Sequence, residues 1–173
     1  PSKDDADIKH MYGKTGLKNV MKSNKLNSEF EYKNPDERIF NINNIGKYSG
    51  KIKSVCDNIL TSKGIVVIYS QYIYGGVVPM ALALEELGFK RYGSDNLFKE
   101  SPNEGIDAKT MLPKSEVSRS QFKQAQYSLI TGEKSLSPNN IKEIKKLTDK
   151  ENMHGEQIKV AIISRAGSEG IDL

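Results

Sequence analysis

The chain has 173 residues, 36% of them hydrophobic and 28% charged, which suits one globular domain with a hydrophobic core. No apolar run approaches the roughly 20 residues of a membrane-spanning helix, and the polar start gives no sign of a secretion signal. Cys56 is the only cysteine, which excludes an internal disulfide, and two histidines are too few for an expected zinc site. We therefore expect an intracellular protein that binds no metal itself, whose net charge of +4 is compatible with a phosphate-bearing partner.

The first 37 residues are predominantly polar, and we interpret them as an N-terminal arm that is ordered only in part. Residues 11–21 could nevertheless form a short helix. They contain the triplet Gly13-Lys14-Thr15, which is similar to the end of a phosphate-binding loop. The triplet lacks both the preceding strand and the first glycine of that motif, so we predict no nucleotide site here.

The predicted domain runs from residue 38 to residue 173, and its first helix begins near Tyr48. Apolar residues recur there at helical spacing, with Ser49 placed to cap the start and Gly64 just past the end. Residues 65–69, IVVIY, then form a continuous aliphatic and aromatic run. Such a run is typical of a strand that is covered on both faces of a parallel sheet.

A second helix is predicted over residues 78–87, with Pro79 in its first turn and Gly88 at its end. We expect a short strand at residues 89–92. Residues 93–125 are polar and show no periodicity, which indicates a surface insertion that is mobile in part.

The remaining elements are a strand at residues 127–131, a helix after Ser137 and a final strand at residues 158–163. Ser137 is predicted to cap this helix. The side chains expected to face inward are Ile141, Ile144 and Leu147. The alternation of strands and helices predicts right-handed crossovers, and therefore an α/β fold with a parallel sheet and flanking helices.

Polar loops follow three of the predicted strands, and ligands of open parallel sheets bind at the carboxyl ends of the strands. We therefore expect the segments after Tyr69, Ile130 and Ile163 to project from one side of a single sheet. These loops combine hydroxyl groups, backbone N–H groups and small residues, which suit a phosphodiester backbone. Arg165 would add a charge-assisted contact, and Asp172 could accept a hydrogen bond from a ribose hydroxyl.

Ordinary structural roles stay open for the same residues. Ser70 and Gln71 could simply close a strand, and Gly132 could be only a turn glycine. The segment AGSEG, residues 166–170, could be a tight turn and does not match the dinucleotide-binding fingerprint. From the residues alone, the prediction is a parallel α/β domain with a polar rim suited to phosphates.

Five segments, in order, carry a resemblance to a known family: KYSGKIKSVCDNI, IVVIYSQY, PMALALEELGF, YSLITGE and VAIISRAGSEGIDL. Residues 38–173 resemble the second RecA-like domain of superfamily 2 helicases, above all the Snf2-like and poxvirus early-transcription-type helicases of large nucleocytoplasmic DNA viruses. The residues that this resemblance implies for nucleic-acid binding are Ser70, Gln71, Thr131, Gly132, Ser164, Arg165, Ala166 and Gly167. Those implied to approach ATP are Gly170 and Asp172.

The resemblance implies an ATP-dependent helicase or translocase of DNA or RNA, used in viral transcription or genome handling inside the host cell or the virion. ATP would bind between this domain and an upstream RecA-like domain that holds Mg²⁺. The resemblance also implies that the domain formed by residues 38–173 is incomplete at its carboxyl end. The phosphate loop and the arginine-bearing motif VI do not occur in these 173 residues, so we do not expect this chain alone to hydrolyse ATP. Two alternatives stay open: a basic α/β module that binds nucleic acid without catalysis, and a Rossmann-like enzyme that uses a nucleotide or a sugar.

Overall fold

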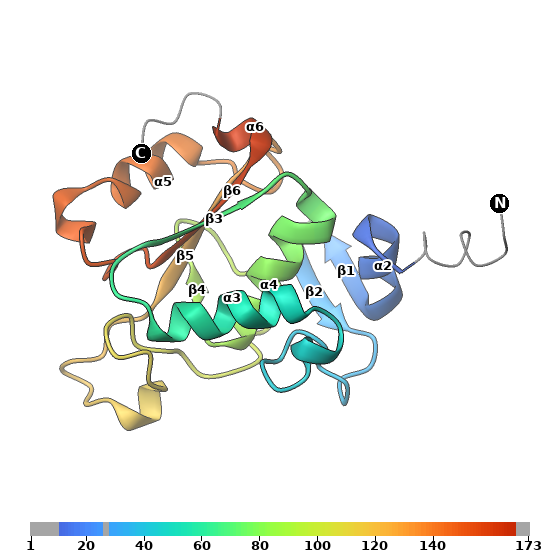
Figure 1. Cartoon of the computed structure of the whole chain (residues 1–173), viewed down its shortest axis with the longest axis horizontal. Helices are drawn as coiled ribbons and strands as arrows, with labels where there is room; N and C mark the ends of the chain where they lie inside the picture. Colours follow the sequence, from blue (N-terminus) through green and yellow to red (C-terminus); the bar gives the residue numbers. More distant parts are fainter. Residues whose placement is uncertain (1–10, 26–27, 169–173) are drawn as a thin grey trace, which may run out of the picture.

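The computed structural model describes residues 11–25 and 28–168, and a four-stranded parallel sheet lies at its centre (Figure 1). The strands lie in the order β3 (Val66–Ser70), β6 (Val160–Ser164), β5 (Gln126–Ile130) and β4 (Lys90–Arg91). Helices α3 (Gly50–Thr61) and α4 (Val78–Glu86) pack on one face of the sheet, and α5 (Asn140–Leu147) packs on the other. This arrangement confirms the predicted α/β fold with a parallel sheet and flanking helices.

The larger hydrophobic core lies between the sheet and the helices α3 and α4. Cys56 and Ile59 of α3 are buried there, together with almost all of α4. A smaller core lies on the opposite face, where Leu147 of α5 packs over the central strands. The strand residues of this second core are Ile130, Ala161 and Ile163.

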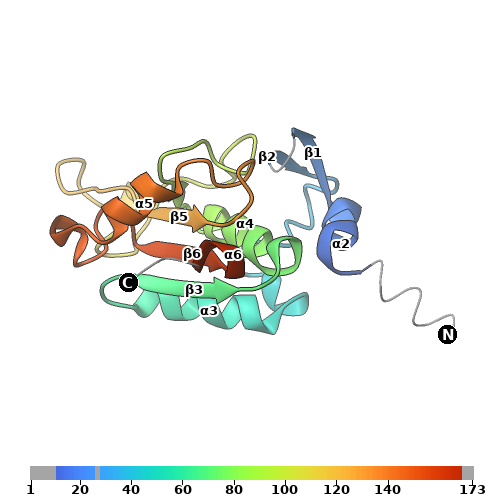
Figure 2. The same ribbon diagram turned by 90° about the horizontal axis from the view of Figure 1, so that it is seen from above.

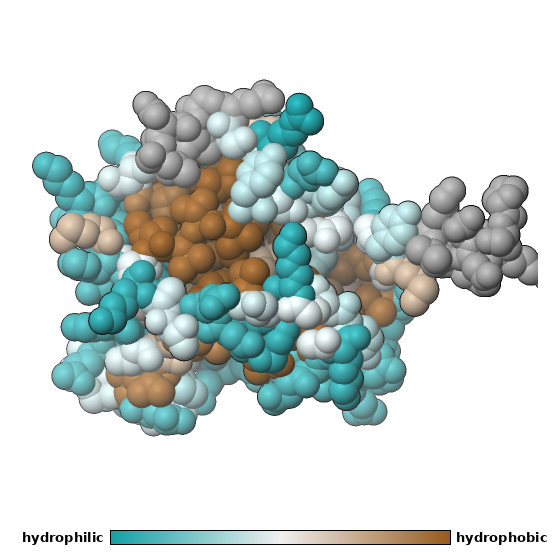
Figure 3. Space-filling model, viewed as in Figure 1, coloured by the Kyte–Doolittle hydropathy of each residue, from teal (hydrophilic) through white to brown (hydrophobic). Residues whose placement is uncertain are grey.

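The outer strand β3 is covered on one face and half-exposed on the other. Val67 and Tyr69 are 52% and 58% exposed, although their register partners on β6, Ala161 and Ile163, are buried. Figure 3 shows hydrophobic side chains at the surface between α3 and α5, on this side of the molecule. The predicted strand is confirmed, but its predicted burial on both faces is wrong because α5 packs over the neighbouring strands instead.

Residues 11–25 and 28–32 fold onto the domain. They form α2 (Gly13–Val20) and an antiparallel hairpin of β1 (Met21–Lys25) and β2 (Ser28–Tyr32). Leu17, Met21 and Phe30 are buried in the larger core. The N–H group of Phe30 also donates a hydrogen bond to the carbonyl of Leu97 (2.8 Å). The short helix expected here is confirmed as α2. Residues that pack into the core occur well before residue 37. The domain boundary at residue 37 stays a prediction.

Three sequence signals at the ends of α3 and α4, from Ser49, Pro79 and Gly88, act as predicted, whereas α3 ends at Thr61, three residues before Gly64. The hydroxyl of Ser49 accepts a hydrogen bond from the N–H group of Ile52 (3.2 Å), and Pro79 lies in the first turn of α4. Gly88 follows α4 with a φ of 94°, and a side chain there would overlap neighbouring backbone. A π-helical turn, η2 (Ile73–Val77), leads into α4 and was not predicted.

The predicted start of α5 is wrong. The hydroxyl of Ser137 does not cap the helix, which begins at Asn140. The Ser137 hydroxyl lies 2.7 Å from the hydroxyl of Thr131, and it accepts a hydrogen bond from the N–H group of Thr131 (3.0 Å). Ser137 is therefore fixed to the end of β5, because the buried N–H group of Thr131 needs an acceptor.

The inward face of α5 also differs from the prediction. Ile141 is 85% exposed, whereas Leu147 is buried and Ile144 is partly buried. Glu143 takes the inward position one turn before Leu147, and its carboxylate accepts a hydrogen bond from the N–H group of Leu129 (3.2 Å). A polar contact with the sheet thus sets the orientation of the helix, which an apolar pattern does not reveal.

Residues 93–125 contain no α-helix, as predicted, although a 3₁₀ turn, η3 (Lys114–Glu116), lies within them. Hydrogen bonds tie the segment together through Asp107, which accepts from the N–H groups of Lys123 and Thr110 (both 2.8 Å). Leu97 is fully buried against the domain. Two further 3₁₀ turns are η1 (Ile45–Lys47) and η4 (Lys150–Asn152).

Candidate nucleic-acid interface

The carboxyl ends of β3, β6 and β5 lie side by side, because these three strands are adjacent and parallel. Ser70 at the end of β3 is in register with Ser164 of β6, and Ile130 of β5 is in register with Ile163. Figure 2 shows β3 and β5 pointing in the same direction, with α6 (Arg165–Ser168) at the end of β6. The predicted projection of the three following segments from one side of a single sheet is confirmed.

A hollow of about 470 Å³ opens at these strand ends, and we call it the strand-end hollow. Its lining residues are Gln71, Ile73, Gly132, Glu133, Ser164, Arg165 and Ala166. The structure thus brings together residues from all three predicted loops. Ser70, Thr131 and Gly167 neighbour these residues in the chain but do not line the hollow.

The three predicted hydroxyl groups are engaged within their own loops. Ser70 Oγ and Thr131 Oγ1 accept hydrogen bonds from the N–H groups two residues further along the chain (3.3 and 3.2 Å). Ser164 Oγ accepts a hydrogen bond from the N–H group of Gly167 (3.2 Å) within the first turn of α6. These hydroxyls stabilise the loops. The side chain of Ser70 therefore has the structural role left open above, that of closing a strand.

Arg165 and Gln71 present exposed side chains at the strand-end hollow. Arg165 begins α6, so the loop predicted for residues 165–168 is wrong: a helical turn follows β6 directly, with the Ser164 hydroxyl at its start. Within the described parts of the chain, no acidic side chain pairs with the guanidinium of Arg165. An exposed guanidinium of this kind suits a bidentate contact with a phosphate.

Two glycines allow the elements around the hollow to approach each other closely. A Cβ atom on Gly167 would overlap the carbonyl oxygen of Ile130, and one on Gly76 would overlap the hydroxyl of Ser70. The missing side chains therefore let α6 pack against the end of β5 and let η2 pack against the end of β3.

Sequence reasoning missed several residues around the hollow. Glu133 and Ile73 line it, and the hydroxyl of Tyr74 donates a hydrogen bond to Glu133 Oε1 (3.1 Å). Lys14 Nζ of α2 lies 4.9 Å from the centre of the Tyr74 ring. The only local signal was the presence of polar and aromatic residues after β3, since the π-helical turn that directs Tyr74 has no sequence signature we could recognise.

The chain is similar to curated proteins of African swine fever virus that are named termination factor NPH-I homolog. It is 31% identical over 143 residues to the protein of a warthog isolate, and 32% identical over 135 residues to that of a tick isolate from Malawi. Each alignment covers 72% of this chain and 19% of the viral protein, so the chain spans about a fifth of the length of the curated relatives it matches. No family model matches the chain.

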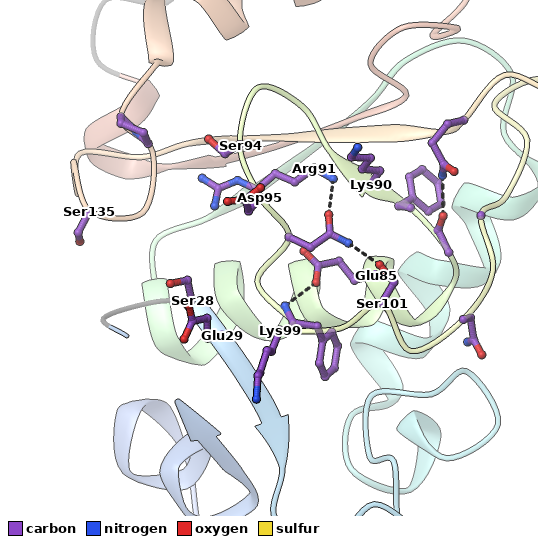
Figure 4. Close-up of a pocket in the computed structure, with 18 residues that line it drawn as sticks. Ser28, Glu29, Glu85, Lys90, Arg91, Ser94, Asp95, Lys99, Ser101 and Ser135 are labelled. Atoms are coloured by element: carbon purple, nitrogen blue, oxygen red, sulfur yellow. Dashed lines mark hydrogen bonds between the residues drawn. The ribbon is translucent and has the colours of Figure 1, made fainter. Parts of the chain in front are cut away.

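A second hollow, of about 630 Å³, lies beside β4 and is shown in Figure 4. Glu85 at its wall accepts hydrogen bonds from the N–H groups of Leu97 and Phe98 (2.7 and 2.8 Å) and from the hydroxyl of Tyr127 (2.5 Å). Burial raises the pKa of Glu85 to about 7 in spite of these hydrogen bonds. Because they join α4, β5 and the segment of residues 93–125, we assign Glu85 a structural role.

The residues predicted to approach ATP, Gly170 and Asp172, lie outside the described residues, and their positions stay predictions. Among residues 11–25 and 28–168, no group of three or more His, Cys, Asp and Glu side chains could hold a metal ion. In the same part of the chain, no helix is both long and apolar enough to cross a membrane.

Proposed function

We propose that this chain forms most of the C-terminal RecA-like lobe of a superfamily 2 helicase or translocase that acts in viral transcription or genome handling. The observation that carries the proposal is the strand-end hollow, where Gln71, Gly132 and Arg165 come together from three different strand ends. The similarity to the termination factor NPH-I homologs of African swine fever virus supports the same conclusion. We place this function inside the infected cell or the virion.

The hollow suits the sugar–phosphate backbone of DNA or RNA better than the bases. The guanidinium of Arg165 would form charge-assisted hydrogen bonds with a phosphate, and the amide of Gln71 would donate to a phosphate oxygen. Gly132 is exposed at the hollow, so a strand can reach the protein backbone there. Contacts of this kind do not depend on sequence, which is what a protein that moves along a strand needs.

ATP would bind between this lobe and an upstream RecA-like lobe of the same polypeptide, which would hold Mg²⁺. Gly170 and Asp172 would approach the nucleotide from this side. Closure of the two lobes on ATP, and their reopening after hydrolysis, would shift the grip of the strand-end hollow along the strand. Phosphoryl transfer depends on groups that position the phosphates and stabilise their charge, so the 173-residue chain alone is proposed to be inactive.

The test is Arg165→Ala in the full-length protein, with ATP hydrolysis measured at increasing concentrations of single-stranded nucleic acid. A hydrogen bond to a charged group contributes roughly 1.5–3 kcal/mol, so we expect the apparent affinity for nucleic acid to fall about tenfold or more. The matched control is Arg119→Ala, which removes an exposed arginine from the segment of residues 93–125. Equal affinities for the two variants would count against the proposal.

The same measurement separates the alternatives. Nucleic-acid binding by the full-length protein without ATP hydrolysis would favour a non-enzymatic basic module, which the net charge of +4 and the exposed Arg165 also support. Use of a nucleotide without any response to nucleic acid would favour a Rossmann-like enzyme.

A further inference from the structure

The described lining of the strand-end hollow carries no net charge. Among the described residues that line it, only Arg165 and Glu133 are charged, and their charges cancel. A strand of nucleic acid carries one negative charge for each phosphate, and its affinity for proteins comes largely from cationic side chains. A track for nucleic acid at this place therefore needs positive charge from a neighbouring element.

Helix α2 supplies such charge. Lys14 and Lys18 are exposed and lie one turn apart on the helix, while Gly16 and Leu17 are buried against the domain. The helix, GKTGLKNV, contains no acidic residue, so nothing within it neutralises the two lysines. Figure 2 shows α2 beyond the end of the sheet toward which β3 and β5 point.

A chain of contacts joins α2 to the strand-end hollow. Lys14 Nζ lies 4.9 Å from the centre of the Tyr74 ring, and the hydroxyl of Tyr74 bonds to Glu133, which lines the hollow. The helix also lies directly against η2, where a Cβ atom on Gly75 would be 4.0 Å from the Cα atom of Gly13. The Lys14 end of α2 therefore adjoins the hollow.

We propose that Lys14 and Lys18 bind phosphates of the single strand that occupies the strand-end hollow, so that α2 forms a second part of the nucleic-acid site. This inference rests on the proposed function and extends it to an element outside the segments that carry the helicase resemblance. The triplet at residues 13–15 then serves as a contact for a phosphodiester rather than as a nucleotide loop. The contact of Lys14 with the ring of Tyr74 gives Lys14 a structural role as well, whereas Lys18 has no such partner among the described residues.

The test is the salt dependence of binding between the 173-residue chain and a fluorescein-labelled single-stranded dodecamer. For single strands, the slope of the logarithm of the binding constant against the logarithm of the salt concentration becomes shallower by roughly 0.7 for each phosphate contact that is removed. The variant Lys14→Ala/Lys18→Ala is therefore expected to lose about 1.4 of slope, and Lys14→Arg/Lys18→Arg is expected to keep it. The matched control is Lys63→Ala/Lys150→Ala, which removes two exposed lysines that precede the amino ends of β3 and β6 and should leave the slope unchanged.

Four outcomes would overturn the inference. Equal slopes for the two double-alanine variants would exclude a role for α2, and a lost slope in the arginine variant would show that charge is not what matters. If Arg165→Ala weakens binding in this assay while the α2 variant does not, the strand-end hollow stands and the inference alone fails. If the wild-type chain binds no dodecamer at low salt, the inference and the proposed function both fail.

Discussion

Gly132 and Ala166 lie against each other where the loop after β5 meets α6: a Cβ atom on Gly132 would be 2.6 Å from the Cβ atom of Ala166. Carbon atoms do not approach so closely, so the two segments fit together only because residue 132 has no side chain. Arg165 precedes Ala166 in α6. The position of its guanidinium therefore depends on the loop that follows a different strand.

Gly132→Ala is expected to push α6 outward and to weaken binding of a single-stranded oligonucleotide about tenfold. Overpacking of this kind costs roughly 1–3 kcal/mol, and tenfold in affinity corresponds to about 1.4 kcal/mol. The second change Ala166→Gly removes the clash and should restore binding in the double variant. Fluorescence anisotropy with the 173-residue chain measures all three forms, and a double variant as weak as Gly132→Ala would contradict this account.

Asp107 holds residues 93–125 in place although they contain no α-helix. Burial opposes the ionisation of its carboxyl, but hydrogen bonds from three backbone N–H groups and the hydroxyl of Thr110 hold its pKa below the usual value. Asp107→Asn turns an acceptor into an NH₂ group that faces N–H donors, at a cost of roughly 1–3 kcal/mol. We expect faster tryptic cleavage at Arg119 under native conditions, followed by mass spectrometry. The exposed Asp95→Asn is the control, and identical cleavage rates for the two variants would refute the role of Asp107.

Glu143 makes the stability of the chain depend on pH. Burial raises the pKa of its carboxyl to about 7, and the positive charge of Arg91 only partly opposes this rise. In the unfolded chain the pKa is about 4.5. Between these values the folded chain keeps a proton that the unfolded chain has released. The contribution of Glu143 to the free energy of unfolding is therefore fully present below about pH 4.5 and is lost as the pH rises through about 7.

Glu143→Gln removes this titration. We expect the difference in the free energy of unfolding between pH 5 and pH 8 to shrink by roughly 1–3 kcal/mol, as measured by urea denaturation. Glu85, whose pKa burial also raises to about 7, should preserve part of the dependence. The exposed Glu116→Gln is the control, and a Glu143→Gln chain with the pH dependence of the wild type would disprove the assignment.

Local sequence signals predicted the elements that depend on near neighbours. Ser49 and Pro79 indicated α3 and α4 because capping and the fixed φ of proline act within one turn of a helix. The orientation of α5 was missed because it depends on Glu143 reaching a backbone N–H group of β5. Leu17 and Phe30 stand among polar residues, so only the folding of α2 and the hairpin onto the domain reveals them as core residues.

The candidate site was predictable in its place but not in its details. Alternating strands and helices implied a parallel sheet, and a parallel sheet brings Gln71, Gly132 and Arg165 to one edge. Which groups face a ligand depends on hydrogen bonds inside each loop, and these bonds occupy the hydroxyls of Ser70 and Thr131. Whether the eight predicted residues contact nucleic acid stays a prediction.

In the described sheet, β3 is bonded to β6 alone, and β6 is the last of the four strands in the chain. During synthesis on the ribosome, α3, β3 and α4 are therefore made long before β6, the strand with which β3 pairs. Until β6 is made, β3 stays unpaired and its apolar side chains stay exposed in the nascent chain. Such delayed pairing of distant segments makes folding slow and exposes the chain to aggregation. Chaperones that shield this early segment until β6 has emerged would raise the yield of folded protein.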